Sequence, residues 1–500
     1  MNDFHNPDKY KPILVTGATG YVGGRLVPRL LEAGYRVRCL VRDRSRLAGH
    51  NWLDQVEIIE ADVLEPETLP AAFDGTSAAY YLIHGVKSGR VEAERDRTAA
   101  QNFAEAAEQA GIQRIIYLGE LANPDVDLSP YQRSRLETGE ILRAGKVPVT
   151  EFRAGMIVGS GSVLFEMIRY LSERQVVWLC PQWFYTETQP IAIRNTLDYL
   201  LSALETSESS GKVIEIGGAT RMRYADMLWA YAAERNFKRV LIPMPVNSPY
   251  FSALWVHLVS PIQWHIVLPL IQGLRHKNLV TSDLAREIFP EIQPLDFRTA
   301  VSLALATIRR GFIETHWSDS LVSSAGDESP YRFSVEEGMM IERRQMLLDL
   351  QHETVFDAYT GIGGERGWLY MDWAWEIRGW MDKLVGGVGL RRGRRHPDEI
   401  RAGESLDFWR VEEIKPGRSI LLRAEMKTPG RAWLQFESVP QADGKTLLKL
   451  GAYFAPKGVA GLLYWYSLFP IHKFIFDGML RNVARRARQL GESEQVAHAS

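Results

Sequence analysis

The 500-residue chain is poor in cysteine, and its two cysteines, Cys39 and Cys180, cannot build a disulfide framework. Small secreted domains depend on such frameworks, so this class of protein is excluded. The N-terminus is short and polar and lacks the apolar run of a secretory signal peptide. These absences predict a cytoplasmic protein, because free thiols suit a reducing compartment.

An excess of charge of one sign is also missing. Lys and Arg number 59 and Asp and Glu 61, which gives a formal net charge of −2. A balanced chain has no general attraction to nucleic acid, so we expect no such partner. The spacing of Cys and His residues matches no metal site, and no metal ligand is predicted.

One long segment, Val240–Leu274, contains no Lys, Arg, Asp or Glu. It is long enough to span a bilayer, but five prolines interrupt it and would free backbone groups that lipid cannot satisfy. The segment therefore favours two short buried helices, or an apolar lid over a substrate site. A peripheral contact with the inner face of a membrane stays an alternative.

What the sequence does contain is a phosphate-binding pattern near its start. An apolar run, Ile13–Val15, leads into three glycines spaced three apart and then into an apolar helical pattern. Such glycines bend the chain and admit a pyrophosphate, which the start of the helix binds. The motif alone also fits an ordinary β–α turn. The residues expected to contact the dinucleotide here are Thr16, Gly17, Thr19, Gly20, Tyr21, Val22 and Gly23.

Strand-like and helix-like segments alternate after this turn, with a helix expected over about 92–110. Alternation of this kind predicts an α/β fold with a doubly wound parallel sheet, the Rossmann architecture. It also makes dinucleotide binding the favoured interpretation of the glycines. The further predicted strands are Arg36–Val41, Val56–Ile59, Ala78–Ile83, Arg114–Leu118 and Val149–Arg153.

The chain length predicts two or three domains. We expect an NAD(P)-binding domain over residues 1–315, with the substrate region at about 156–315 built from insertions and extensions of the same sheet. A polar segment at 316–335 is typical of a linker. A separate α+β domain is expected over 336–492.

Within this second domain, three segments with period-two alternation are separated by Pro-Gly and Asp-Gly turns, which predicts an antiparallel meander. A long amphipathic helix over about 460–489, broken or kinked at Pro470, is expected to lie in the grip of this sheet. The three strand segments are Ile420–Met426, Trp433–Phe436 and Leu448–Phe454.

The choice of cofactor is expected to depend on the end of the second strand. Arg42 favours NADPH over NADH, because a guanidinium binds a 2′-phosphate well. Asp43 is the counter-argument, because an acid there binds a free 2′-hydroxyl. Asp62 and Val63 follow the third strand and are placed to reach adenine, and His84 follows the fourth and is placed near the ribose. A structural loop histidine is an equal interpretation of His84.

The catalytic candidates are Tyr131 and Arg135. Ser129, Pro130 and Gln132 predict a helix start with a capping box, which puts Tyr131 and Arg135 one turn apart on one face. A tyrosine there could give a proton to a carbonyl, and a nearby cation would lower its pKa. Helix packing or substrate contact is the other interpretation of Tyr131.

The N-terminal part resembles the extended and atypical short-chain dehydrogenases/reductases (SDRs). The segments Thr16–Gly23 and Ile214–Gly218 carry the resemblance, which covers roughly 12–306. It implies a Rossmann core, NAD(P), and often a Tyr-x-x-x-Lys pair with an upstream Ser or Thr. This chain departs from the pattern, because Arg135 stands where Lys would be and Gly119–Leu121 offers no hydroxyl.

The C-terminal part resembles START-like (SRPBCC, helix-grip) domains, and also an uncharacterised domain fused to atypical SDRs in bacteria. The resemblance depends on Arg378–Gly387, Phe408–Val411 and Tyr464–Tyr466. It implies an apolar cavity with a hydrophobic ligand. Aromatic side chains that could line that cavity, or pack the core instead, are Trp368, Tyr370, Trp373, Trp375 and Trp380.

These observations predict an atypical SDR oxidoreductase that uses NADPH to reduce a hydrophobic carbonyl or quinone-like substrate. The alternative is a non-catalytic NAD(P)-binding sensor or scaffold, including a peripheral membrane accessory subunit of the kind found in respiratory complexes. The sequence indicates no oligomeric state.

Overall fold

The computed structural model of the chain has two compact units, Met1–Gly326 and Asp327–Ser500. The predicted linker at 316–335 lies largely outside the residues that the structure describes, so the domain boundaries stay a prediction. The structure describes residues 11–47, 50, 52–83, 90–123, 128–245, 247–260, 262, 264–309, 331–336, 338–363, 368, 370–371, 373, 400–441 and 444–499.

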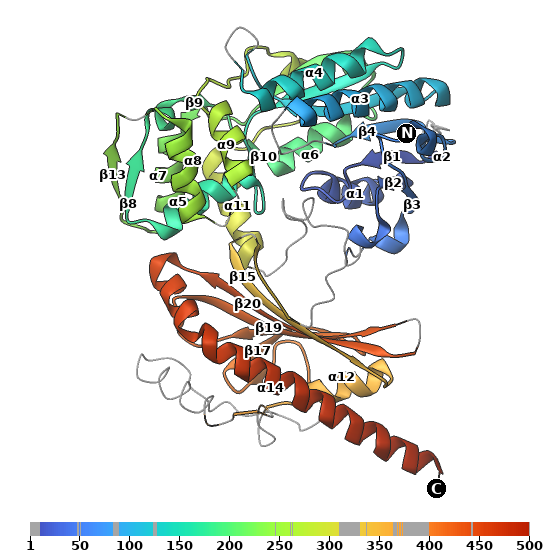
Figure 1. The fold of residues 1–500 in the computed structure, drawn as a ribbon, viewed down its shortest axis with the longest axis vertical. Coiled ribbons are helices and arrows are strands. Elements are labelled where there is room, and N and C mark those ends of the chain that lie inside the picture. Colours follow the sequence, from blue (N-terminus) through green and yellow to red (C-terminus); the bar gives the residue numbers. More distant parts are fainter. Residues whose placement is uncertain are drawn as a thin grey trace. The chain divides into compact units, whose positions relative to one another are not determined.

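A seven-stranded parallel sheet forms the centre of the first unit and confirms the Rossmann prediction (Figure 1). Every pairing in it is parallel. The strand order reverses between β1 and β4, and ligands of such sheets bind outside the carboxyl ends of the strands at this point. In spatial order the strands are Val213–Ile216 (β11), Val149–Ala154 (β6), Arg114–Glu120 (β5), Ala78–Tyr81 (β4), Ile13–Thr16 (β1), Val37–Val41 (β2) and Glu57–Glu60 (β3).

Helices cover both faces of this sheet. Ile13 and Val15 pack toward one face and Leu14 toward the other, so β1 is apolar on both faces up to its last residue, Thr16. The first core lies against Gly23–Glu32 (α1) and Ile193–Ser202 (α6). The second lies against Leu69–Phe73 (α2), Arg90–Ala110 (α3) and Pro130–Ala144 (α4).

The region after β6 extends the sheet only through β11. Its other strands are two to four residues long and form three separate two-stranded sheets, so the expected extension of the main sheet is confirmed for β11 alone. The small sheets pair Ile157–Val158 (β7) with Ile191–Ala192 (β10), Val177–Cys180 (β8) with Val240–Pro243 (β13), and Glu187–Thr188 (β9) with Met222–Arg223 (β12). The helices are Val163–Arg174 (α5), Tyr224–Glu234 (α7), Pro249–Val259 (α8), Trp264–Gly273 (α9), Leu284–Ile288 (α10) and Phe297–Arg309 (α11).

The second unit is an antiparallel sheet with helices, and the predicted meander is confirmed. The sequence analysis missed the strands before it. In spatial order the sheet contains Tyr331–Glu336 (β14), Met339–Leu348 (β15), Thr446–Pro456 (β20), Gly430–Pro440 (β19), Ser419–Ala424 (β18), Trp409–Lys415 (β17) and Ser405–Leu406 (β16). The helices are His352–Thr360 (α12) and Gly458–Ala499 (α14).

The long helix α14 is continuous through Pro470, so the expected break is absent. A proline removes one backbone hydrogen bond, and packing of Phe476 and Met479 into the core holds the helix together around it. Trp368 packs against Phe408 and Trp409 and is therefore a core residue. Trp373 is exposed, while Trp375 and Trp380 lie outside the described residues.

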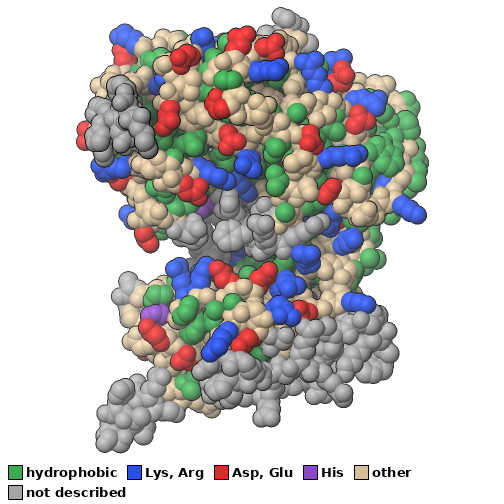
Figure 2. Space-filling model, turned by 180° about the vertical axis from the view of Figure 1, so that it is seen from behind, with side chains coloured by type: hydrophobic (Ala, Val, Ile, Leu, Met, Phe, Trp, Pro, Cys, Tyr) green, Lys and Arg blue, Asp and Glu red, His purple; other side chains and the backbone are tan. Residues whose placement is uncertain are grey.

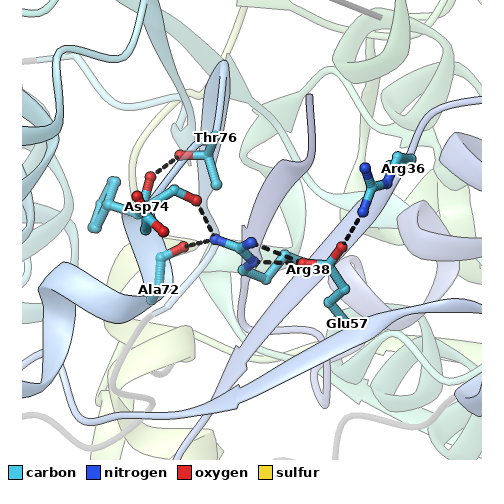
Figure 3. Close-up of polar contacts among 7 residues, drawn as sticks. Arg36, Arg38, Glu57, Ala72, Asp74 and Thr76 are labelled. Atoms are coloured by element: carbon cyan, nitrogen blue, oxygen red, sulfur yellow. Dashed lines mark hydrogen bonds and ion pairs between the residues drawn. The ribbon is translucent and has the colours of Figure 1, made fainter. Parts of the chain in front are cut away.

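The amino end of β2 is tied to its neighbours by Arg38 (Figure 3). The Arg38 guanidinium pairs with Glu57 of β3 at 2.8 Å and donates to the backbone oxygens of Ala72 and Asp74 at 3.1 and 2.6 Å. Arg36 reaches the same carboxylate at 2.6 Å. Burial opposes the charge of Glu57, but the two arginines outweigh it and lower its pKa.

We expect Arg38→Met to destabilise the first unit by about 1–2 kcal/mol, because the oxygens of Ala72 and Asp74 lose their charged donor and Glu57 loses the more buried of its two partners. Arg36→Met is the matched control. Its side chain is 61% exposed, so the loss should stay below about 0.5 kcal/mol. Urea unfolding of the two variants measures the difference, and equal losses would show that Arg38 acts only as a surface charge.

Candidate functional site

A cavity of about 560 Å³ lies at the carboxyl edge of the parallel sheet. It collects residues from β2, β5 and β6, from the turns after β1, β3 and β4, and from α3, α4 and α9, although they are far apart in sequence. Thr16 does not line it, and His84 lies outside the described residues. The predicted residues that line it are Gly17, Thr19, Gly20, Tyr21, Val22, Gly23, Arg42, Asp62, Val63, Tyr131 and Arg135.

The three glycines of the first turn have different structural roles. Gly17 has a φ of +70°, and a Cβ there would lie 2.7 Å from the carbonyl oxygen of Leu82. A Cβ on Gly23 would collide with the backbone of Gly17. Gly20 is different, because its nearest obstacle is the Gly17 oxygen at 3.2 Å. Gly17 and Gly23 are therefore needed for the fold of the turn, while Gly20 keeps open the space over the cavity.

The start of α1 fits an anion. No side chain caps this helix, whose N-cap residue is Val22. Gly24 and Arg25 donate their N–H groups to the oxygens of Gly20 and Val22 at 3.0 and 3.1 Å, so the N–H groups just before them are the ones that can reach phosphate oxygens. Thr16 supports the turn from behind, because its hydroxyl donates to the oxygen of Tyr80 at 2.9 Å and accepts from the N–H of Leu82 at 3.1 Å. The turn thus offers the cradle that a dinucleotide pyrophosphate requires.

Arg25 is a site residue that the sequence analysis missed. It is buried, its guanidinium carbon lies 4.2 Å from the centre of the Tyr21 ring, and it donates to the backbone oxygen of Ser160 at 3.0 Å. It therefore fixes Tyr21 and ties the glycine turn to the segment after β7. An arginine in a helix gives no sequence signal of such burial.

Arg42 lies at the end of β2, exposed and facing the cavity. No described carboxylate forms an ion pair with it. The Asp62 carboxylate accepts from the N–H of Leu64 at 3.0 Å, which fixes this loop at the cavity wall. Among the described residues, the Arg42 guanidinium thus has no ion-pair partner. It lies beside the space where the adenosine ribose binds in Rossmann domains, at the end of the second strand.

The capping box at the start of α4 is present, and the side chains of Ser129 and Gln132 both take part. As expected, Tyr131 and Arg135 share a face, with the guanidinium carbon 5.1 Å from the ring centre. On the other side, Asp96 of α3 acts on Arg135 electrostatically and accepts from the hydroxyl of Ser134 at 2.8 Å.

The expectation of a lowered pKa for Tyr131 is wrong. Burial raises the pKa of the phenol, and the opposing effect of Arg135 is smaller. Arg135 is itself buried, and Tyr131, Tyr117 and Asp96 together raise its pKa. Tyr131 is therefore a neutral phenol at physiological pH and is able to donate a hydrogen bond.

Glu120 is a second residue whose part in the site was missed. It ends β5, lines the cavity, and its Oε1 accepts from Nε2 of Gln132 at 3.4 Å. Its Oε2 is buried and has no hydrogen-bond partner in the described part of the chain. Burial raises the pKa of the carboxyl to about 7, against the smaller effects of Arg135 and Gln132. The sequence did contain one signal of this role: a charged residue at the carboxyl end of a predicted buried strand, which is the edge of the sheet where ligands bind.

The uncharged segment forms α8 and α9, as predicted. Ile266, Leu270 and Leu274 line the cavity and make one of its walls apolar. The end of α9 also approaches α4, since a Cβ on Gly273 would lie 3.2 Å from Cδ of Gln132. The second helix of the segment is therefore a wall of the candidate site.

The expected burial of this segment is wrong for the outer face of α8. Tyr250, Leu254 and Leu258 are 60, 48 and 70% exposed. Figure 2 shows hydrophobic side chains gathered at the outer edge of the first unit, where α8 and the small sheet of β8 and β13 lie. Among the helices that the structure describes, none combines the length and the apolar character needed to cross a membrane.

Comparison with known families agrees with this geometry. Residues 17–156 match the family described as NAD(P)H-binding, and residues 339–479 match a family described as a protein of unknown function (DUF2867). The chain thus has a Rossmann domain that matches the NAD(P)H-binding family, followed by a segment that matches DUF2867. The START-like assignment of the second domain stays a prediction.

The curated relatives that match part of the chain include an assembly factor and two proteins named as reductases. The photosystem II assembly factor Ycf39 of Cyanophora paradoxa is 27% identical, over 43% of this chain and 66% of that protein. Divinyl chlorophyllide a 8-vinyl-reductase of Zea mays is 24% identical, over 50 and 65%. Ceramide reductase of Caulobacter vibrioides is 31% identical, over 30 and 47%. The chain spans less than two thirds of the length of each of them.

We expect Gly20→Ala to weaken dinucleotide binding at least about tenfold, because a methyl group there enters the space for the pyrophosphate. Thermal stability should change little. Gly145→Ala is the matched control, since its Cβ would meet a backbone oxygen at 3.3 Å, similar to the 3.2 Å at Gly20, but outside the cavity. Fluorescence titration with NADPH measures both, and equal affinities would contradict this position for the pyrophosphate.

Proposed function

We propose that the chain is an oxidoreductase that uses NADPH to reduce a hydrophobic carbonyl or quinone-like substrate. One observation carries the proposal: a single cavity joins the glycine turn and Arg42 to Tyr131 and to the apolar wall of α9. A dinucleotide seat, a phenol donor and an apolar surface are what reduction of such a substrate requires. The matches to two proteins named as reductases support it.

In such an enzyme, each part of the site would have its own role. Bound NADPH would supply the hydride. The glycine turn and the start of α1 bind the pyrophosphate, and Arg42 binds the 2′-phosphate. Tyr131 donates a hydrogen bond to the substrate oxygen, Arg135 holds the phenol in place, and α9 keeps water away from the apolar part of the substrate.

We expect wild type to bind NADPH more tightly than NADH, and Arg42→Ala to abolish most of that preference. Loss of a charge-assisted hydrogen bond of about 1.5–3 kcal/mol lowers NADPH affinity by about 10–100-fold. The NADH affinity should stay within about twofold. Arg29→Ala, an exposed arginine on α1, is the control. Failure of both cofactors to bind at millimolar concentration would overturn the proposed function.

A non-catalytic sensor is the second candidate, and Arg135 at the lysine position together with the missing hydroxyl at 119–121 favours it. Tyr131→Phe separates the two. For a reductase, we expect kcat with phenanthrenequinone and NADPH to fall by about 10²–10³-fold, because the developing oxyanion loses a hydrogen-bond donor, while NADPH affinity is kept. Tight NADPH binding without NADPH oxidation across carbonyls and quinones would favour the sensor.

The exposed face of α8 also supports peripheral contact with an anionic membrane surface. Apolar side chains project from a segment without charges, and Lys238 and Arg239 precede it while Arg275 and Lys277 follow it. Apolar side chains flanked by cations are the pattern of an interfacial helix. A substrate dissolved in lipid would then lie near the helix pair that walls the cavity.

We expect wild type to float with vesicles that contain anionic lipid and to be released by salt. Replacing Leu254 and Leu258 together by serine should abolish flotation, whereas Leu303→Ser, an exposed leucine on α11, should not. Absence of flotation would refute the membrane contact. A concentration-dependent dimer that the same double variant abolishes would assign the face to a second copy of the chain instead.

A further inference from the structure

Glu120 is the last residue of β5, at the carboxyl edge of the sheet. The strand pairs in parallel with β4 as far as Tyr117 and with β6 over its whole end, where Glu120 lies opposite Ala154, so the position of this last residue is fixed by β6. Its side chain lines the same cavity as Tyr131. The carboxyl is therefore held by rigid structure beside the space for the reacting group.

The hydrogen bonds of this carboxyl are incomplete. Oε1 accepts from Gln132 at a long 3.4 Å, and the buried Oε2 has no partner in the described part of the chain. A buried polar atom without a partner is costly, and in native proteins it usually serves a ligand or a reaction. The unused oxygen of Glu120 is thus available to a group that enters the cavity.

Burial makes this carboxyl easy to protonate, against the effect of its polar neighbours. From α4 it meets Arg135, Tyr131 and Gln132, and from α7 it meets Tyr224. On α3, the residues Glu92, Arg95 and Asp96 line the same cavity, while α9 contributes apolar side chains. Arg135, the cation that acts on Glu120 among the described residues, is shared with Asp96 and the tyrosines. Burial therefore outweighs it.

We propose that Glu120 gives the proton that completes reduction of the substrate. This inference rests on the proposed function. As the carbonyl carbon accepts hydride, the π electron pair of C=O moves to the oxygen, and that oxygen takes the proton of the Glu120 carboxylic acid. The O–H bond of the acid breaks, the O–H bond of the alcohol forms, and solvent later returns a proton to the carboxylate. Tyr131 keeps its proton and positions the oxygen.

The first measurement needs no turnover. A cationic oxidised nicotinamide beside the carboxyl favours the carboxylate, so NADP⁺ binding to the full-length protein at pH 7 should release protons. NADPH binding should release fewer. Calorimetry in buffers of different ionisation enthalpy counts these protons. Glu120→Gln should abolish the difference, and Glu105→Gln, an exposed glutamate on α3, should keep it. A difference that persists in Glu120→Gln overturns the proposal.

The second measurement uses stability. The folded carboxyl keeps a proton that the unfolded chain, with its ordinary pKa of 4.5, has already released. Stability should therefore fall as pH rises from about 4.5 to about 7, and Glu120→Gln should remove this component. An unchanged pH dependence of Tm in the variant counts against a titrating Glu120. Should the variant not fold, Glu120→Asp, which keeps a carboxyl, should retain the proton release.

The third measurement uses the reaction, with NADPH and phenanthrenequinone. Wild-type kcat should fall as pH rises above about 7, because the acid loses its proton. Glu120→Gln should lower kcat at least tenfold and flatten this profile, with KM for NADPH unchanged. Normal NADPH binding with an unaltered pH profile in Glu120→Gln would overturn this inference alone, whereas loss of NADPH binding in wild type would overturn the proposed function. If the protein does not reduce phenanthrenequinone, the proton release on cofactor binding decides whether the inference holds.

Discussion

Close backbone packing at the point where β1 meets β4 is the constraint on which the first unit depends. Only a glycine at position 17, with its positive φ, fits against the Leu82 carbonyl, and only a glycine at 23 lets α1 begin against that turn. The hydroxyl of Thr16 joins the same two strands. The proposed cofactor site is thus formed by contacts that the fold itself requires. Gly20 is different, because its missing side chain leaves space for the ligand.

Behind this seat, burial competes with charge, and burial wins at the groups that matter for proton transfer. Arg135 was expected to ease ionisation of Tyr131, yet the pKa of Tyr131 is raised. The same desolvation brings the pKa of the Glu120 carboxyl to about 7. Among the two acids, the tyrosine is fixed in its neutral form and the glutamate exchanges its proton near physiological pH.

The alternation of strands and helices, the glycine turn and the capping box of α4 could be predicted, because each depends on residues that are neighbours in sequence. The role of Glu120 could not, since its environment comes from α4, α7 and α9. Arg25 was missed for the same reason, because its partner Ser160 lies 135 residues away. The exposed face of α8 was taken as buried, since hydropathy alone does not say which side of a helix has a neighbour.

Gln132 contacts two separate parts of the site, the Glu120 carboxyl and the end of α9. Its backbone N–H completes the cap of α4, its amide donates to Glu120, and the last turn of α9 lies against its side chain. A substrate that pushes α9 outward therefore acts on the hydrogen-bond partner of the acid. A molecule that fills the cavity would then also change the hydrogen bonding of Glu120, and with it the pKa of the carboxyl. A molecule that fits poorly would leave that pKa unsuited to proton transfer even when it is bound.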